Sequence, residues 1–235
     1  MKPPRDRTIE VRGLKIHYLE WGERAAEPLV LIHGFLDHAR SWDTFVAALE
    51  KKSSRPMWII APDCRGHGDS GWVGAGGYYH FPDYLRDLEC LLESLDVEKI
   101  SLIGHSMGGT ISFLYAGTFP KKVRKLVLAE GIGPIAMRFV DAPPRMERWL
   151  AEVKAVPQRK VVEYATLEKA AERLRRKNPR LKPKLVRCQP MVHRVGRCSR
   201  DESDRWAFAT APSRLDRLGR TVMSSASSVR SGASV

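Results

Sequence analysis

The stretch Ser101-Leu102-Ile103-Gly104-His105-Ser106-Met107-Gly108-Gly109 decides the fold of this chain. An apolar run of strand type leads directly into the pattern Gly-x-Ser-x-Gly, and a segment compatible with a helix follows. In that context Ser106 is predicted to lie on a sharp strand-to-helix turn that exposes its hydroxyl as a nucleophile above a sheet. Gly104 and Gly108 suit such a turn because a side chain at either position would crowd it. The alternative is a glycine-rich helix start that binds an anion.

Two upstream segments also consist of an apolar run followed by glycine and polar residues. Residues 29–32 suit a buried strand and lead into His33-Gly34-Phe35. Residues 59–63 lead in the same way into the segment 64–70, Cys-Arg-Gly-His-Gly-Asp-Ser. The three motifs, in this order, resemble the α/β-hydrolase superfamily over residues 8–135. The resemblance implies an α/β fold with a mostly parallel, doubly wound sheet whose ligands bind at the carboxyl ends of its strands.

The remaining pattern of residues 8–135 alternates between strands and helices. Such an alternation predicts parallel strands joined by right-handed helical crossovers. Strands are predicted at residues 8–12, 14–21, 28–32, 57–61, 99–103 and 123–129, and helices at residues 41–50, 81–95 and 107–119.

The character of the sequence changes after Pro134. Residues 143–155 and 161–177 are predicted to form two charged amphipathic helices, and the resemblance implies that helices at this place cap the active site. We therefore expect an α/β-hydrolase core over 1–135, a helical cap segment over 136–182, and a basic, Ser-rich, poorly ordered tail over 183–235. No apolar strand is recognised beyond Leu181. We therefore expect a C-terminally truncated fold, in which truncation or an altered reading frame has removed the last strands of the sheet.

Composition and charge limit the function classes. The 235 residues carry a net charge of +13, and residues 1–130 contribute none of it, with 17 Lys and Arg against 17 Asp and Glu. The basic half has few aromatics and no recognised nucleic-acid motif, so no nucleic-acid partner is expected. No run approaches the roughly 20 apolar residues of a membrane span, and no signal sequence is recognised, so a cytoplasmic location is expected. The four cysteines lack metal-type spacing, and no metal or cofactor is predicted.

The motifs supply most of an acyl-transfer mechanism. Ser106 is predicted to attack the carbonyl of a small acyl ester substrate and to form an acyl-enzyme. The backbone N–H groups of Met107 and Phe35 are the predicted oxyanion-hole donors. The residues expected to support this loop and turn are His33, Gly34, Gly104, His105 and Gly108. Asp63, Arg65, His67 and Asp69 are expected to stabilise the neighbouring loop.

The acid and the base are the incomplete part of the prediction. The family order places an acid and then a histidine after the nucleophile. Glu130, at the end of a predicted strand, is the candidate acid. His193 is the only histidine after Ser106 and is the candidate base, but its surroundings do not resemble the family's Gly-x-x-His ending. The sequence thus leaves three functions open: a serine hydrolase (an esterase), a weak or inactive hydrolase-like protein without its triad histidine, and a binding module that uses the basic tail.

Overall fold

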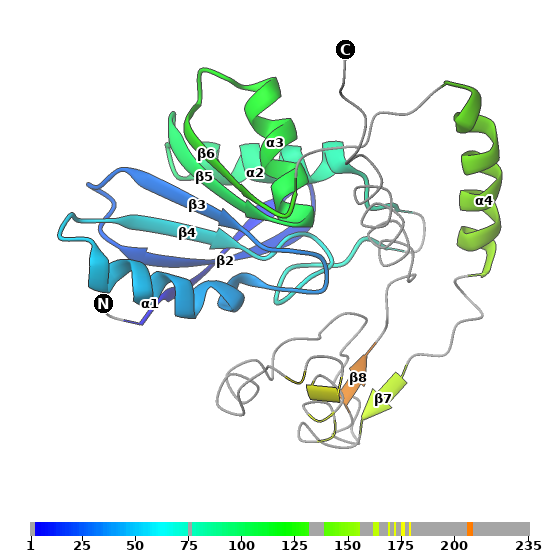
Figure 1. Cartoon of the computed structure of the whole chain (residues 1–235), viewed down its shortest axis with the longest axis horizontal. Coiled ribbons are helices and arrows are strands. Elements are labelled where there is room, and N and C mark those ends of the chain that lie inside the picture. The colour runs from blue at the N-terminus through cyan, green and yellow to red at the C-terminus, as the bar shows by residue number, and fades with distance from the viewer. Residues whose placement is uncertain are drawn as a thin grey trace, which may run out of the picture.

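A six-stranded mixed sheet forms the centre of the structure (Figure 1). The computed structural model describes residues 3–74, 77–131 and 139–155, and shorter pieces at 162–164, 169, 172, 175–176, 179 and 206–208. The strand order is β1-β2-β4-β3-β5-β6. The strands are β1 (Arg5–Val11), β2 (Leu14–Gly22), β3 (Pro28–Ile32), β4 (Trp58–Pro62), β5 (Ile100–His105) and β6 (Val123–Ala129).

The sheet is antiparallel at one side and parallel at the other. β1 pairs with β2 and β2 with β4 in antiparallel register, whereas β4, β3, β5 and β6 run parallel. Arg12 and Gly13 join β1 to β2 with φ angles of 51° and 75°, which is the geometry of a tight two-residue hairpin. Because the four parallel strands end at one edge of the sheet, the segments that follow β3, β4, β5 and β6 meet there.

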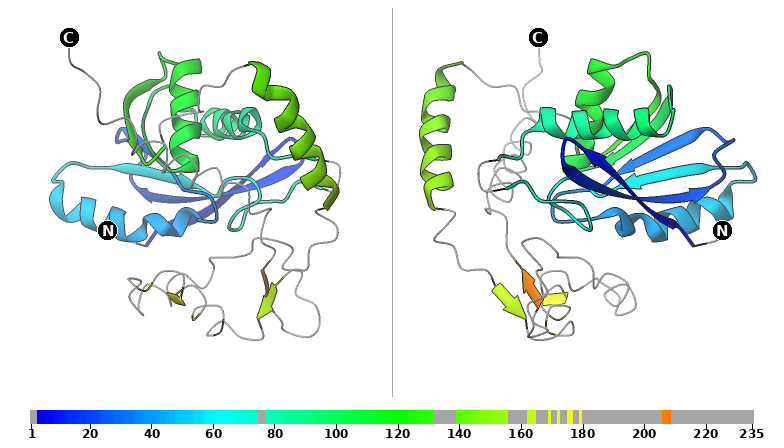
Figure 2. Two further views of the ribbon diagram at one scale, coloured as in Figure 1. Left: turned by 45° about the vertical axis from the view of Figure 1, so that its right-hand side comes forward. Right: turned by 180° about the vertical axis from the view of Figure 1, so that it is seen from behind.

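Helices cover both faces of this sheet (Figures 1 and 2). The 3-10 helix η1 (Ala39–Trp42) and α1 (Asp43–Lys52) cover one face, and α2 (Phe81–Ser94) and α3 (Met107–Thr118) cover the other. Successive residues of a strand point to opposite faces, so β3 contributes to two apolar clusters. Leu31 packs with Val46 of α1, while Val30 packs in the cluster that contains Ile111 of α3.

The strands and helices predicted within residues 8–135 are confirmed. The strand at residues 28–32 and the strand at residues 123–129 have the predicted bounds, and the other ends differ by three residues or fewer. The segment predicted as one helix from residue 41 is divided into η1 and α1.

After residue 135 the prediction is correct in one place and wrong in another. The 3-10 helix η2 (Phe139–Asp141) leads into α4 (Ala142–Ala155), which is the first predicted cap helix. Residues 162–164, predicted as helix, instead form the strand β7 (Val162–Tyr164), which pairs antiparallel with β8 (Trp206–Phe208). Valine and aromatic residues favour strands, and the partner strand lies too far along the chain for a local periodicity to reveal it.

The strand β8 also corrects the expectation that no strand follows Leu181. Apart from β8, the expected tail at residues 183–235 lies outside the described residues. In the part of the chain that the structure describes, no helix combines the length and the hydropathy that a membrane crossing needs.

Candidate active site

Ser106 lies between the end of β5 and the start of α3 in a strained conformation. Its φ is 51° and its ψ is −113°, outside the regions that non-glycine residues usually adopt. Its N–H donates to the carbonyl of Ala129 at 2.8 Å, and its carbonyl accepts from the N–H of Thr110 at 3.1 Å. The backbone of the turn is therefore fixed on the side of β6 and on the side of the helix.

Glycine is required on both sides of this turn because the backbone comes so close. A Cβ at position 104 would lie 2.3 Å from the carbonyl oxygen of Gly108. A Cβ at Gly108 would lie 2.2 Å from the carbonyl oxygen of Ile32, at the end of β3. The pattern Gly-x-Ser-x-Gly thus allows the first turn of α3 to pack directly against the end of the neighbouring strand.

The predicted oxyanion donors belong to the two segments that this packing brings together. Met107 is the first residue of α3, so its N–H has no acceptor within the helix. Phe35 belongs to the loop after β3, and its ring lies edge-on to the ring of His67, with a centroid distance of 5.8 Å. Gly34 lies between these segments: a Cβ there would fall 2.8 Å from His105 Nδ1 and 3.5 Å from Ser106 Cβ.

His33 is buried, and both of its ring nitrogens are hydrogen-bonded. Nδ1 donates to the carbonyl of Gly34 at 2.7 Å, and Nε2 accepts from the N–H of Cys64 at 3.0 Å. This pattern suits one neutral tautomer and ties the loop after β3 to the loop after β4.

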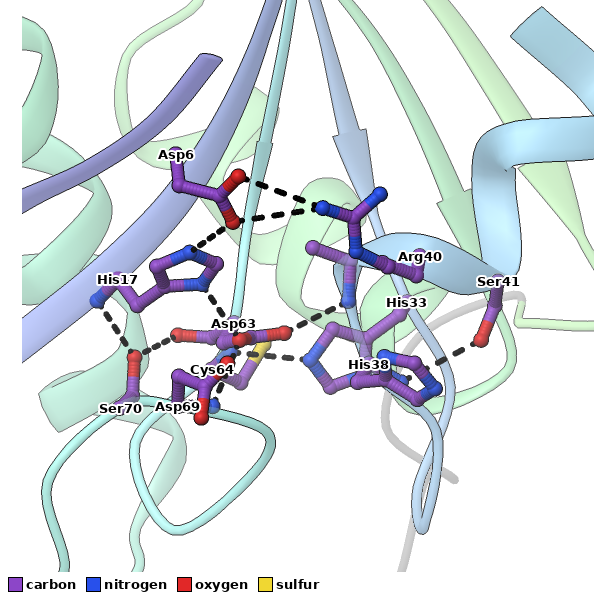
Figure 3. Close-up of polar contacts among 11 residues, drawn as sticks. Asp6, His17, His33, His38, Arg40, Ser41, Asp63, Cys64, Asp69 and Ser70 are labelled. Carbon is purple, nitrogen blue, oxygen red and sulfur yellow. Dashed lines mark hydrogen bonds and ion pairs between the residues drawn. The ribbon is translucent and has the colours of Figure 1, made fainter. Parts of the chain in front are cut away.

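Asp63 fixes the other end of the loop after β3 (Figure 3). Its Oδ1 accepts from the N–H of Ala39 at 2.6 Å, and its Oδ2 accepts from the N–H of Asp69 at 2.8 Å and from His17 Nδ1 at 2.7 Å. Burial alone would raise the pKa of Asp63, but the hydrogen bonds from His17 and from the two backbone donors lower it overall. Asp63 therefore carries its charge inside the protein and joins three segments of the chain.

Arg65 and His67 also stabilise the loop after β4. The Arg65 guanidinium donates twice to the buried carboxylate of Asp87 on α2, each time at 2.6 Å. His67 Nδ1 donates to the carbonyl of Arg65 at 3.0 Å, and burial lowers the pKa of His67 to about 4. His67 is therefore a neutral, buried side chain at ordinary pH.

Glu130 lies beside the turn, at the end of β6, and its carboxylate faces the ring of His105. The distance from His105 Nε2 to Glu130 Oε2 is 3.8 Å, and the Glu130 side chain is 75% exposed. The candidate acid is thus close to the histidine that precedes the nucleophile. His193, the candidate base, lies outside the described residues.

No local signal in the sequence marks His17 as part of this site. His17 belongs to β2, where it alternates with apolar residues and resembles an ordinary core position. His17, Asp63 and Asp69 lie close enough together to suggest a cation site. However, His17 Nδ1 faces the Asp63 carboxylate, and both oxygens of Asp63 already accept N–H groups. Each oxygen of Asp63 therefore already has a hydrogen-bond donor within the protein.

Residues 27–209 match the family model for the alpha/beta hydrolase fold. The chain belongs to this family. It is 31% identical over 166 residues to a serine hydrolase-like protein of Danio rerio, a match that covers 68% of this chain and 49% of the relative. It is 32% identical over 120 residues to epoxide hydrolase 4 of Mus musculus, covering 51% of this chain and 32% of the relative.

A solved structure shows the same similarity in three dimensions. The hypothetical protein PA1622 of Pseudomonas aeruginosa PAO1 superposes with a TM-score of 0.74 at 27% identity, covering 89% of this chain and 71% of that one. The chain spans about half or less of the length of the curated relatives described above.

Proposed function

We propose that this chain is a serine hydrolase that cleaves small carboxylic esters through an acyl-enzyme on Ser106. The observation that carries the proposal is the strained φ of Ser106 at a strand-to-helix turn between two obligatory glycines. The cost of such a conformation, of order 1–3 kcal/mol, is typical of functional positions. The similarity to a serine hydrolase-like protein supports the same chemistry.

The proposed reaction has two steps. The Ser106 hydroxyl adds to the ester carbonyl, its proton passes to a base, and the alkoxide leaves to give the acyl-enzyme; water then releases the acid. The N–H groups of Met107 and Phe35 are the proposed donors to the oxyanion that forms in each step. Removing one such donor typically costs about 3 kcal/mol of transition-state stabilisation.

The proposed substrate class depends on the identity of the nucleophile. One relative is an epoxide hydrolase by name, so family membership alone leaves the substrate open. A serine hydroxyl that gives its proton to a base, with oxyanion donors beside it, suits an acyl carbonyl, whose oxygen becomes negatively charged in the transition state. We therefore place esters before epoxides.

We also propose that α4 forms part of a cap at the carboxyl edge of the sheet. The Trp149 ring lies 5.2 Å from the ring of Tyr78 and 6.5 Å from that of His80, both in the segment between β4 and α2. Met146 and Leu150 of α4 are exposed. An apolar helix surface beside the site suits contact with the acyl part of a substrate. The proposed organisation remains a core over 1–135, a cap over 136–182 and a tail over 183–235.

A second candidate function is a weak or inactive hydrolase-like protein. It is favoured by the state of the described histidines near the site, since His33 has both nitrogens engaged and His67 is buried and neutral. Loss of a triad histidine commonly lowers the rate by several powers of ten. In the active alternative, Glu130 and His193 complete the triad as acid and base.

Hydrolysis of p-nitrophenyl acetate and butyrate by the purified protein tests the proposal. We expect turnover that Ser106→Ala abolishes and that the matched Ser112→Ala retains, because the buried Ser112 hydroxyl has no hydrogen-bond partner among the described residues. Loss of turnover in Glu130→Gln and His193→Ala would assign the acid and the base. Folded protein without turnover and without labelling of Ser106 by a fluorophosphonate would refute the proposal and leave the inactive alternative.

A further inference from the structure

His17 lies between two carboxylates that come from different parts of the chain (Figure 3). Its Nδ1 is 2.7 Å from Asp63 Oδ2, in the loop after β4, and its Nε2 is 3.2 Å from Asp6 Oδ1 on β1. Arg40 of η1 contacts the same Asp6 carboxylate at 3.3 Å. The chain therefore surrounds one histidine ring with acceptors at both of its nitrogens.

This geometry determines the protonation state of His17. A carboxylate accepts and does not donate, so both ring nitrogens must carry hydrogen, and only the imidazolium form has two N–H groups. Burial lowers the pKa of His17, but the hydrogen bond and charge of Asp63, together with Asp6 and Asp69, outweigh this and raise it above 6.5. His17 is thus the cation that compensates the buried charge of Asp63.

The carboxylate that His17 compensates also holds the loop that contains Phe35. The loop after β3 is fixed at its start, where the Cys64 N–H donates to His33 Nε2, and at its end, where the Ala39 N–H donates to Asp63 Oδ1. Both anchors belong to two consecutive residues, Asp63 and Cys64. A change in the ionisation of Asp63 would release one end of this loop.

We propose that His17 is a positioning residue that keeps Asp63 ionised and thereby holds the Phe35 loop in place for oxyanion binding. The catalytic part of this inference rests on the proposed serine hydrolase function. The structural part, from His17 through Asp63 to Ala39, does not depend on it. His17 acts through a second residue and is not itself placed at the reacting atoms.

The pH dependence follows from the two groups. The lowered pKa of Asp63 means that its contribution is complete above about pH 3.9, the ordinary value for aspartate, and is lost as the pH falls through the lowered value. The raised pKa of His17 means that its contribution is complete below pH 6.5 and is lost as the pH rises through the raised value. Between these limits the ion pair is intact. Above the raised pKa of His17, the neutral ring has a single N–H and can donate to only one of the two carboxylates.

The proposal can be tested by following the Ala39 and Asp69 backbone amides in ¹⁵N-¹H NMR spectra between pH 6.5 and pH 4, the interval in which His17 stays protonated in the wild type. In the wild type we expect both resonances to keep their positions, because Asp63 stays ionised. In His17→Gln the cation is lost, and we expect both amides to titrate together with a midpoint about 1–3 pH units higher, the usual effect of an opposite charge at this distance. Glu10→Gln, which neutralises an exposed carboxylate of the same strand β1, is the matched control and should behave as the wild type.

A second measurement tests whether the position of the Phe35 loop affects the reactivity of Ser106. The rate at which a fluorophosphonate labels Ser106 should fall at acid pH in His17→Gln over the same interval in which the Ala39 amide shifts. His17→Asn places its amide nitrogen near the position of Nδ1, which faces Asp63, whereas the longer Gln side chain places it near the position of Nε2; His17→Asn should therefore restore part of the wild-type midpoint. If the amides shift as expected but Ser106 of the wild type is not labelled, the link from His17 through Asp63 to Ala39 stands and the proposed function is refuted.

Two results would overturn the inference itself. One is a common midpoint for the Ala39 amide in the wild type and in His17→Gln. The other is failure of both His17→Gln and His17→Asn to fold, which would make His17 a purely structural residue.

Discussion

Replacing Gly108 with alanine should destabilise the protein strongly, because the first turn of α3 rests on the backbone of β3. A Cβ at this position would lie 2.2 Å from the carbonyl oxygen of Ile32 and 2.5 Å from that of His33. Both contacts are with main-chain atoms at the end of a central strand, which cannot rotate away as a side chain can. The clash is relieved only if α3 moves away from the sheet.

The size of the effect follows from this geometry. Overpacking a filled site typically costs 1–3 kcal/mol, and a backbone clash on two atoms favours the upper end, about 3 kcal/mol. For a chain of this size, each kcal/mol corresponds to roughly 2–4 °C in the midpoint of thermal unfolding, so we expect a fall of about 6–12 °C. Because Ser106 directly precedes α3, labelling by a fluorophosphonate should fall as well.

Gly117 of the same helix provides the matched control. A Cβ there would meet nothing within 4 Å, and the residue is exposed. Alanine restricts the unfolded chain and favours a helix, so Gly117→Ala should stabilise the protein by about 0.5 kcal/mol. Urea unfolding followed by far-ultraviolet circular dichroism compares the two variants. Equal midpoints for Gly108→Ala and Gly117→Ala would refute the argument that close backbone approach selects glycine at position 108.

Three further predictions concern buried charged groups and a buried thiol. Arg65→Met leaves the buried carboxylate of Asp87 without its partner and should lower the free energy of unfolding by about 3–5 kcal/mol, whereas the double variant with Asp87→Leu should recover much of it in the same urea assay. Burial alone would raise the pKa of Glu20, but hydrogen bonds from an arginine and a tryptophan lower it, so its stabilising effect is complete above pH 4.5 and is lost as the pH falls through the lowered pKa. The difference in unfolding free energy between wild type and Glu20→Gln should therefore shrink as the pH is lowered from 6 toward 3, and a constant difference would contradict this assignment. Burial raises the pKa of the Cys64 thiol, so iodoacetamide followed by peptide mass spectrometry should find Cys64 unmodified in the native protein and modified in urea, and rapid native modification would show that the loop after β4 opens.

The core of the fold could be predicted from the sequence because its signals are local. The apolar run before Gly104, the glycine pattern around Ser106 and the alternation of strands with helices each arise from residues close together in the chain. The strained turn at Ser106 and the helix that follows it are present where the pattern predicts them. The strand β7 was mistaken for helix because its partner β8 lies more than forty residues further along the chain.

What only the tertiary structure decided is the set of contacts between distant residues. Nothing local distinguishes His17 from an ordinary core residue of an alternating strand; its role depends on Asp63, which lies 46 residues away, and on Asp6 of the neighbouring strand. The proximity of Glu130 to His105 likewise depends on β5 and β6 ending at the same edge of the sheet. A sequence specifies its elements through short-range periodicity and steric limits, whereas the pairing of buried charges is fixed only when the sheet brings those elements together.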